Sequence, residues 1–162
     1  MSPQEPEPSP YVFPDPSLTL RAALDLHRAQ VPGLLGGDDP QTTALFAGHD
    51  VCHVLFGCST RLIDEGRVDL WTMAATTMTV KRYSQYLNHP MVKKLFWSFP
   101  IWQIALSFLS FLDTPRILWR ARHQTRPWDF DAWRDHLDRP LGQIRAELNI
   151  HPTHLPAARL AV

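Results

Sequence analysis

Two histidines four residues apart make the segment 47–57 the part of the chain best suited to chemistry. It reads Ala-Gly-His-Asp-Val-Cys-His-Val-Leu-Phe-Gly, with imidazoles at His49 and His53. On an α-helix, residues at this spacing share one face about 6 Å apart, close enough to ligate one metal ion. Asp50 borders that face and could ligate, orient a histidine or move protons. Two helical histidines alone are more often a surface pair, so the site needs further ligands.

Glu65 is the candidate for a further ligand. Gly57 is a helix-ending residue, so the helices before and after it would form a hairpin with a very short turn. An antiparallel hairpin brings His53 and Glu65 level with each other. On one continuous helix they would lie about 18 Å apart at roughly 1.5 Å per residue and could not share a site. The alternative is that Glu65 is an exposed carboxylate paired with Arg61.

This combination of side chains predicts a divalent metal site. Two imidazoles with one or two carboxylates suit zinc first, and they would also suit iron or manganese. The pattern resembles HExxH, in which the carboxylate between the histidines serves as a general base, with the shorter aspartate in its place. The predicted metal ligands are therefore His49, Asp50, His53 and Glu65, and Asp50 is also the predicted catalytic residue.

The elements that must position these residues are all predicted to be helices. Capping residues and prolines mark a short helix from near Ser17 and a helix carrying Gln41 to about Phe56, with its start signal at 38–40. A longer helix, capped by Ser59 or Thr60, is expected from about Arg61 toward Leu87. Further helices are expected within 95–122, at 128–137 and at 141–148. Strand-like alternation does not persist anywhere. The predicted fold is all-α, a single-domain helical bundle with a metal-binding helical hairpin.

Length and composition limit the organisation of the chain. A chain of 162 residues can bury one sizeable core, which predicts a Pro-rich extended arm over 1–16, a domain over 17–150 and a C-terminal tail over 151–162. Sixteen basic and sixteen acidic residues create no overall basic field, so we expect no nucleic-acid partner. Two cysteines and an acidic N-terminus without a signal or transit pattern predict a reducing, cytoplasmic location.

An apolar segment follows the hairpin. The eighteen residues from Leu95 to Leu112 carry no charge, and Lys93 and Lys94 precede them. The length borders on that of a membrane span, but Pro100 and several polar residues argue against one. Three interpretations stay open: a core helix, an interfacial helix, or one wall of an apolar tunnel for a polyprenyl tail, with the lysines near anionic headgroups.

The metal motif also carries a family resemblance. The sequence His49-Asp50-x-x-His53, followed by eleven residues and Glu65, resembles the metal motif of the coenzyme Q biosynthesis protein 4 family. The stretch 67–87 and the closing stretch 133–150 are similar to it too, so the resemblance covers most of the chain from 17 to 150. Mapped residue by residue, the family's ligands fall on His49, Asp50, His53 and Glu65.

The resemblance implies an activity and a set of partners. It implies an α-helical, peripheral membrane protein that binds prenylated ubiquinone precursors, acts in replacing the C1 carboxyl of the ring with a hydroxyl, and associates with other quinone biosynthesis enzymes. The short chain without a transit peptide looks like a bacterial relative. The alternatives are a non-catalytic prenyl-lipid-binding or scaffolding protein with a structural metal, and a metal-dependent hydrolase that shares the HDxxH spacing. A homodimer is the default oligomer.

Overall fold

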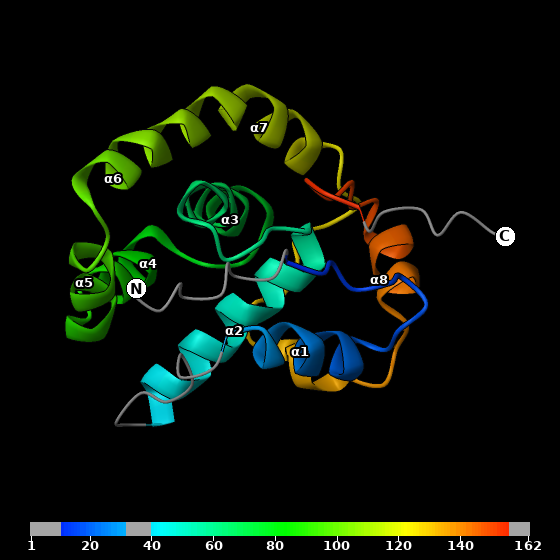
Figure 1. Ribbon diagram of the computed structural model, residues 1–162. Coiled ribbons are helices and arrows are strands. Elements are labelled where there is room, and N and C mark those ends of the chain that lie inside the picture. Colours follow the sequence, from blue (N-terminus) through cyan, green and yellow to red (C-terminus); the bar gives the residue numbers. More distant parts are fainter. Residues whose placement is uncertain (1–10, 32–39, 156–162) are drawn as a thin grey trace, which may run out of the picture.

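All regular structure in this computed structural model is helical, as predicted. The structure describes residues 11–31 and 40–155, and within these ranges there are two isolated β-bridges and no strand. Helix α2 runs from the lower-left edge of the molecule in Figure 1 to its centre, with α1 and α3 packed against it. They are α1 (Leu20–Ala29), α2 (Pro40–Phe56), α3 (Leu62–Ala75), α4 (Val80–Leu87), α5 (Pro90–Trp97), α6 (Ile101–Ser107), α7 (Thr114–Arg122) and α8 (Leu141–Leu148), with the 3-10 helices η1 (Phe108–Asp113) and η2 (Ala132–His136).

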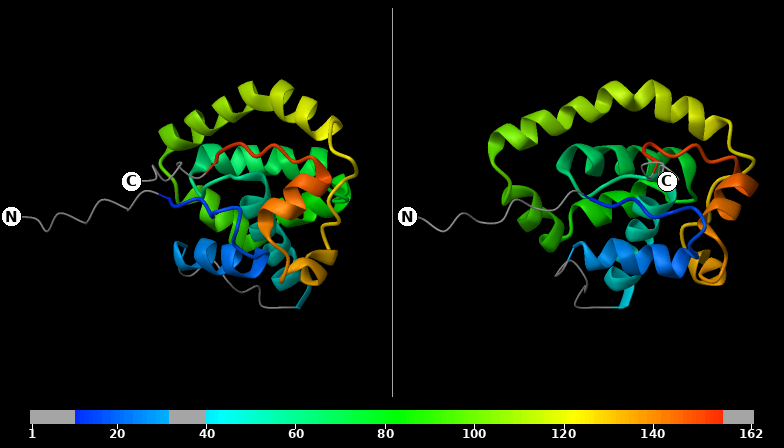
Figure 2. Two further views of the ribbon diagram at one scale, coloured as in Figure 1. Left: turned by 90° about the vertical axis from the view of Figure 1, so that its right-hand side faces the viewer. Right: turned by 45° about the vertical axis from the view of Figure 1, so that its right-hand side comes forward.

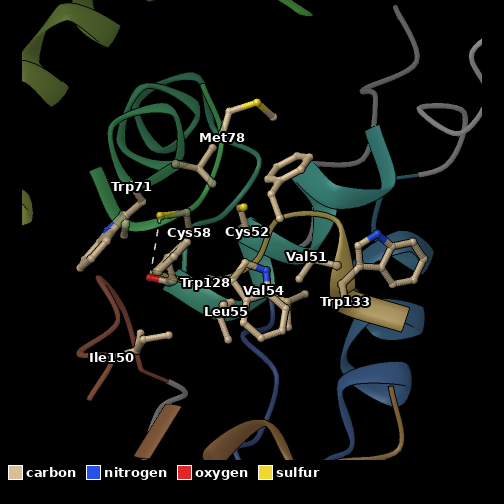
Figure 3. Packing of buried hydrophobic residues seen from close by; sticks show 14 of the residues in the cluster. Val51, Cys52, Val54, Leu55, Cys58, Trp71, Met78, Trp128, Trp133 and Ile150 are labelled. Atoms are coloured by element: carbon tan, nitrogen blue, oxygen red, sulfur yellow. Dashed lines mark hydrogen bonds between the residues drawn. The ribbon is translucent and has the colours of Figure 1, made fainter. Parts of the chain in front are cut away.

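The hydrophobic core forms around the second half of α2. Its side chains Val51, Val54 and Leu55 are fully buried and lie between Trp71 of α3 on one side and Trp133 on the other (Figure 3). Burying each side chain of this kind stabilises the fold by about 1.5–3 kcal/mol. Cys52, which faces away from the two histidines in helical projection, is a buried free thiol in this core, as expected for a small apolar residue. One face of α2 therefore anchors the helix.

The turn between α2 and α3 depends on glycine. Gly57 ends α2 with φ at +65°, in the left-handed region that favours a residue without a side chain. A Cβ at this position would overlap the carbonyl oxygen of His154, because the segment 152–154 packs directly on the turn. The predicted helix end at Gly57 is confirmed.

The predicted cap of α3 is wrong. The N-cap residue is Arg61, which makes no side-chain cap bond, rather than Ser59 or Thr60. Ser59 instead donates its hydroxyl and its backbone N–H to the carboxylate of Asp64, at 2.5 and 3.0 Å. An acidic residue in the first helical turn that reaches back to the preceding loop satisfies the same unpaired donors as a cap does. Asp64 therefore orders the turn from inside α3.

The helix predicted over 61–87 is two helices. α3 ends at Ala75, and Thr76 is extended, with φ −126° and ψ 174°. The Thr76 hydroxyl donates to the Thr72 carbonyl at 2.7 Å and accepts from the Met78 N–H at 3.0 Å. Such bonds offer the backbone an alternative to the helix.

The helix predicted over 128–137 is also wrong. Within that range only η2, at Ala132–His136, is helical. The Trp128 backbone is engaged elsewhere: its N–H donates to the Ala75 carbonyl and its carbonyl accepts from Thr77, both at 2.9 Å. These two bonds form a short parallel bridge beside the end of α3, so the start of the segment is held extended.

The C-terminal part of the chain covers the end of α2. Arg145 of α8 is buried and donates to the carbonyls of Val54 and Leu55 at 2.8 and 2.9 Å. The last carbonyls of a helix lack partners within it, so a guanidinium there satisfies them and complements the helix dipole. Burial lowers the Arg145 pKa to about 10, which leaves the group charged at neutral pH. The Thr153 N–H donates to the Phe56 carbonyl at 2.7 Å, so the first residues of the predicted tail lie against the turn.

The segment 101–122 forms an arch over α3. Its helices α6, η1 and α7 follow one another in a continuous curve along one side of the molecule (Figures 1 and 2). Ile104, Ser110 and Ile117 are buried on its inner side, and Gly66 of α3 leaves room for Ser110. The outer side chains are exposed, including Leu112 at 77%, so the interpretation of 95–112 as a core helix is wrong. Within the described residues, no helix is long and apolar enough to cross a membrane.

The N-terminal arm lies against α1 where it is described. Residues 11–15 are extended, and the backbone N–H of Val12 donates to the Gln30 side chain at 2.6 Å. α1 begins later than predicted, with Thr19 as a side-chain cap that accepts from Ala22. The remaining parts of the predicted arm and tail, and the stop and start signals at 32–39, lie outside the described residues.

Candidate metal centre

α2 and α3 bring three of the predicted ligands together beside their turn. One possible ligand atom from each of His49, His53 and Glu65 lies within 4.8 Å of the other two, so this group could hold a metal ion. His53 Nε2 lies 3.4 Å from Glu65 Oε2, which confirms that the turn brings these residues level. The two helices cross rather than run antiparallel, since α3 is seen nearly end-on where α2 runs across the view (Figure 1). The group lies where the two helices cross.

The protein orients the His53 imidazole without a metal. His53 is 3% exposed, and its Nδ1 lies 3.3 Å from the backbone carbonyl of Cys58. A carbonyl can only accept, so Nδ1 carries a proton, and Nε2 faces Glu65. Histidines that ligate metals are commonly fixed in this way by a hydrogen bond from the other ring nitrogen.

His49 carries an unsatisfied nitrogen. Its Nε2 is buried and has no hydrogen-bond partner among the described residues. A buried polar atom without a partner costs roughly 1–3 kcal/mol, and such atoms are uncommon in folded proteins. A bound cation at this point would satisfy the lone pair. The orphaned nitrogen therefore fits a metal ligand better than it fits a structural histidine.

His53 and Glu65 shift each other's pKa in opposite directions, and each shift favours the charged form. Burial disfavours the charged form of His53, but the adjacent Glu65 carboxylate outweighs it and raises the His53 pKa. Burial likewise acts to raise the pKa of Glu65, and His53 outweighs it, so the Glu65 pKa is lowered. These opposite shifts favour a proton between His53 Nε2 and Glu65 Oε2 in the metal-free protein, and a divalent ion would take the place of that proton.

The structure does not bring Asp50 into this group. Its Oδ2 accepts from Arg28 Nε at 3.1 Å, and its Oδ1 lies 3.9 Å from His27 Nε2, so both oxygens face α1. Burial raises the Asp50 pKa against the opposing effect of Arg28. The assignment of Asp50 as a ligand and catalytic residue stays a prediction, whereas Glu65 faces His53 rather than the alternative partner Arg61.

Two residues that sequence reasoning missed also lie at the site. His27 of α1 is 3% exposed, its ring stacks on that of His53 with centroids 5.1 Å apart, and the Tyr11 hydroxyl lies 2.6 Å from its Nδ1. Burial and the neighbouring His53 lower the His27 pKa to about 3, so the ring is neutral. Asp69 faces His49 with 3.5 Å between its Oδ1 and Nε2. The sequence did contain a signal for Asp69, because Asp69 follows Glu65 by four residues, as His53 follows His49.

A cavity of about 390 Å³ opens onto the candidate metal group. This volume lies within the range of small-molecule sites, which are mostly apolar with a few convergent polar groups. Polar side chains line part of it, among them His49, His53 and Glu65. The apolar lining comes from α2, α4 and the α5 region, chiefly from Phe46, Leu87, Val92, Phe96 and Phe99.

Comparisons of the chain with protein-family models, with curated proteins and with solved structures find no match. The site itself therefore carries the functional information. Its distinguishing feature is a group of two buried imidazoles and a half-buried carboxylate on the wall of a largely apolar cavity.

Proposed function

We propose that the protein binds a divalent metal ion and a prenylated hydroxybenzoate, and acts in ubiquinone biosynthesis by oxidative decarboxylation of the ring. The main observation that supports this proposal is the cavity, whose wall combines the group His49, His53 and Glu65 with an apolar lining. Such a site suits a ligand with an acidic ring at one end and a hydrocarbon tail at the other. The resemblance of the HDxxH and Glu65 pattern to the coenzyme Q biosynthesis protein 4 family supports this choice of substrate.

Zinc is the first candidate for the metal. Mixed imidazole and carboxylate donors suit zinc, and iron(II) and manganese(II) accept the same donors. When bound, such an ion would polarise and orient the carboxylate of the substrate. His49, His53 and Glu65 would hold it.

The chain's own residues would position the ring and keep water out. Arg28 carries the one guanidinium among the described residues that line the cavity, and Asp50 fixes its Nε at 3.1 Å. The guanidinium would orient the carboxylate of the substrate, while Phe96 and Phe99 exclude water along the tail. The net reaction replaces the ring carboxyl with hydroxyl and releases CO₂. The new oxygen comes from dioxygen, whose second atom leaves as water with two electrons from a reductant.

The test follows the carboxyl carbon. Metal-loaded protein is mixed with a short-tailed prenylated hydroxybenzoate labelled in its carboxyl group, in air, with a chemical reductant. We expect labelled CO₂ and the matching hydroquinone from the wild type, and neither from His53→Ala. Binding of the benzoate without any release of CO₂ would contradict the enzymatic role.

The second candidate function is a non-catalytic one, in which the protein presents a prenyl lipid to partner enzymes and the metal is structural. The same apolar cavity favours it. It differs in its prediction for the metal-free state, because a structural ion contributes directly to folding. Under this alternative a chelator unfolds the protein, and lipid extracted from the purified protein contains polyprenyl compounds.

The outer side of the arch is proposed as the surface that meets a membrane. Large apolar side chains are exposed there: Trp97 just before it, and Ile101, Trp102, Leu106, Phe108, Leu109, Phe111, Leu112, Leu118 and Trp119 along it. Many large apolar side chains exposed along one segment of a molecule suit an interaction site.

Charge favours an anionic bilayer as the partner of this surface. Five of the 16 basic residues but one of the 16 acidic residues lie in the segment 90–122, although the whole chain is neutral. The acidic one, Asp113, is paired with Arg67 of α3 at 2.7 Å. Basic residues beside an apolar surface suit anionic lipid headgroups. Phe96 and Phe99 line the cavity and adjoin the start of the arch, so a prenyl tail could pass between bilayer and cavity there.

A further inference from the structure

We infer that Asp69 is the fourth protein ligand of the metal, and that Asp50 is not a ligand. This rests on the metal site of the proposed function and goes beyond the ligand set that the motif implies. α2 offers His49 and His53 four residues apart, and α3 offers Glu65 and Asp69 at the same spacing. Each helix thus presents two potential ligands on one face, one turn apart.

Two distances across the helix crossing support this arrangement. His53 Nε2 lies 3.4 Å from Glu65 Oε2, and His49 Nε2 lies 3.5 Å from Asp69 Oδ1. Ligand atoms that bind zinc at about 2.0–2.2 Å in a tetrahedron are separated from each other by about 3.3–3.6 Å. Each cross-helix pair has the separation of two ligands on one ion. Asp69 lies outside the group of three that is mutually within 4.8 Å, so its side chain would turn toward the ion on binding.

The buried nitrogen of His49 is an independent observation. His49 is 7% exposed and its Nε2 makes no hydrogen bond among the described residues, although Asp69 Oδ1 lies 3.5 Å from it. In the tautomer that carries its proton on Nδ1, the Nε2 lone pair and the carboxylate oxygen of Asp69 repel each other. A cation between them turns that repulsion into two favourable contacts.

The balance of charge favours Asp69 rather than Asp50 as the metal ligand. A divalent ion with two neutral imidazoles and the carboxylates of Glu65 and Asp69 has no net charge, which suits a partly buried site. Asp50 already neutralises Arg28 at 3.1 Å, and its oxygens face α1. Using Asp50 as a ligand would take from Arg28 the carboxylate that neutralises it. The structure thus assigns Asp50 to positioning Arg28.

The test compares Asp69→Asn with Asp50→Asn, a matched pair in which each substitution removes one carboxylate charge beside the same histidines. Zinc affinity is measured by competition with a chromophoric chelator, and circular dichroism verifies that each variant is folded. We expect Asp69→Asn to weaken zinc binding by at least about tenfold. We expect Asp50→Asn to bind zinc as the wild type does.

Cobalt(II) provides a second readout that a purely structural role would not change. The visible absorption of bound Co²⁺ reports the number and geometry of its ligands. Asp69→Asn should alter that spectrum and Asp50→Asn should leave it unchanged. If Asp50→Asn weakens zinc binding as much as Asp69→Asn does, or if Asp69→Asn has no effect, the inference is overturned while the metal site stands. A wild type that binds no metal overturns the proposed function as well.

Discussion

At the scale of single residues, the site is prepared before any ligand arrives. The Cys58 carbonyl holds a proton of His53 on the nitrogen that points away from Glu65. His27 stacks on His53 and stays neutral, with the Tyr11 hydroxyl 2.6 Å from its Nδ1. Such supporting contacts fix ring orientation and tune how strongly an imidazole binds a metal. These contacts also bury titratable side chains, whose protonation then affects the stability of the fold.

Burial of His27 predicts that the stability of the protein depends on pH. The folded-state pKa of His27 is about 3, below the ordinary value of 6.5, because the ring is buried beside His53. Below pH 6.5 the unfolded chain takes up a proton at His27 that the folded chain refuses until about pH 3. The free energy of unfolding therefore falls as the pH decreases through this window, by on the order of 2 kcal/mol at pH 5. Urea titrations of the metal-free protein at pH 7 and pH 5 measure it.

The control for this prediction is His27→Gln. The variant retains the pair of His53 and Glu65, so the difference between its pH dependence and that of the wild type isolates His27. We expect the variant to lose less stability between pH 7 and pH 5. An equal loss in both proteins would mean that His27 titrates normally in the fold.

Sequence reasoning identified the central ligands but not their surroundings. His49, His53 and Glu65 could be predicted because their spacing and the glycine between them define a local geometry. His27 and Tyr11 could not, since their contacts with the site depend on how α1 and the arm pack against α2. Asp50 was chosen for its place in the motif, whereas its contact with Arg28 depends on that same packing.

At the scale of elements, the turn at Gly57 decides whether the site forms. It requires a left-handed backbone, and the chain at 152–154 occupies the space where a side chain would lie. Gly57→Ala should therefore reduce the free energy of unfolding by about 1–3 kcal/mol. It should also weaken metal binding, because the turn sets how α2 and α3 cross. Chemical denaturation and a zinc titration measure the two effects.

Asn149→Gly is the comparison for this variant. Asn149 also has a positive φ, of 53°, at the end of α8 and far from the metal ligands in the sequence. Glycine there relieves backbone strain and removes the bond from the Asn149 side chain to the His123 carbonyl, two effects that oppose each other. We expect a small change in stability and unchanged metal binding. Unaltered stability in Gly57→Ala would contradict the role given to the turn.

Some helix boundaries could be predicted from the sequence and others could not. Prolines and glycines marked the helix ends that are set locally, such as Gly57. The break at Thr76 was missed because it depends on a hydroxyl that competes with the helix and on pairing with Trp128, fifty-two residues away. The arch was ambiguous because an uncharged apolar run looks the same whether its side chains face the core or the solvent.

At the scale of the whole molecule, the arch carries many of the exposed large apolar side chains. The chain outside 90–122 has more acidic than basic residues. This arrangement predicts binding to vesicles rich in anionic phospholipid, weaker binding to zwitterionic vesicles, and weakening by salt. Trp102→Glu combined with Leu112→Glu should abolish binding in a sedimentation assay. Val80→Glu is the control, because Val80 is 72% exposed on α4, outside the arch.

Two outcomes would contradict the membrane proposal. One is equal binding of the wild type and the double variant to anionic vesicles. The other is a wild type that ignores vesicles but forms a dimer that the double variant loses, as seen by analytical ultracentrifugation. In that case the arch is an interface between two copies of the chain.

The account depends most directly on the metal group, so the decisive measurement is metal content. Elemental mass spectrometry at known protein concentration compares the wild type with His53→Ala and Glu65→Ala, and circular dichroism monitors helix content. The account predicts close to one equivalent of a single divalent metal in the wild type, and its loss in both variants with helix content largely kept. Little metal in the wild type, or the same amount in all three proteins, would contradict it.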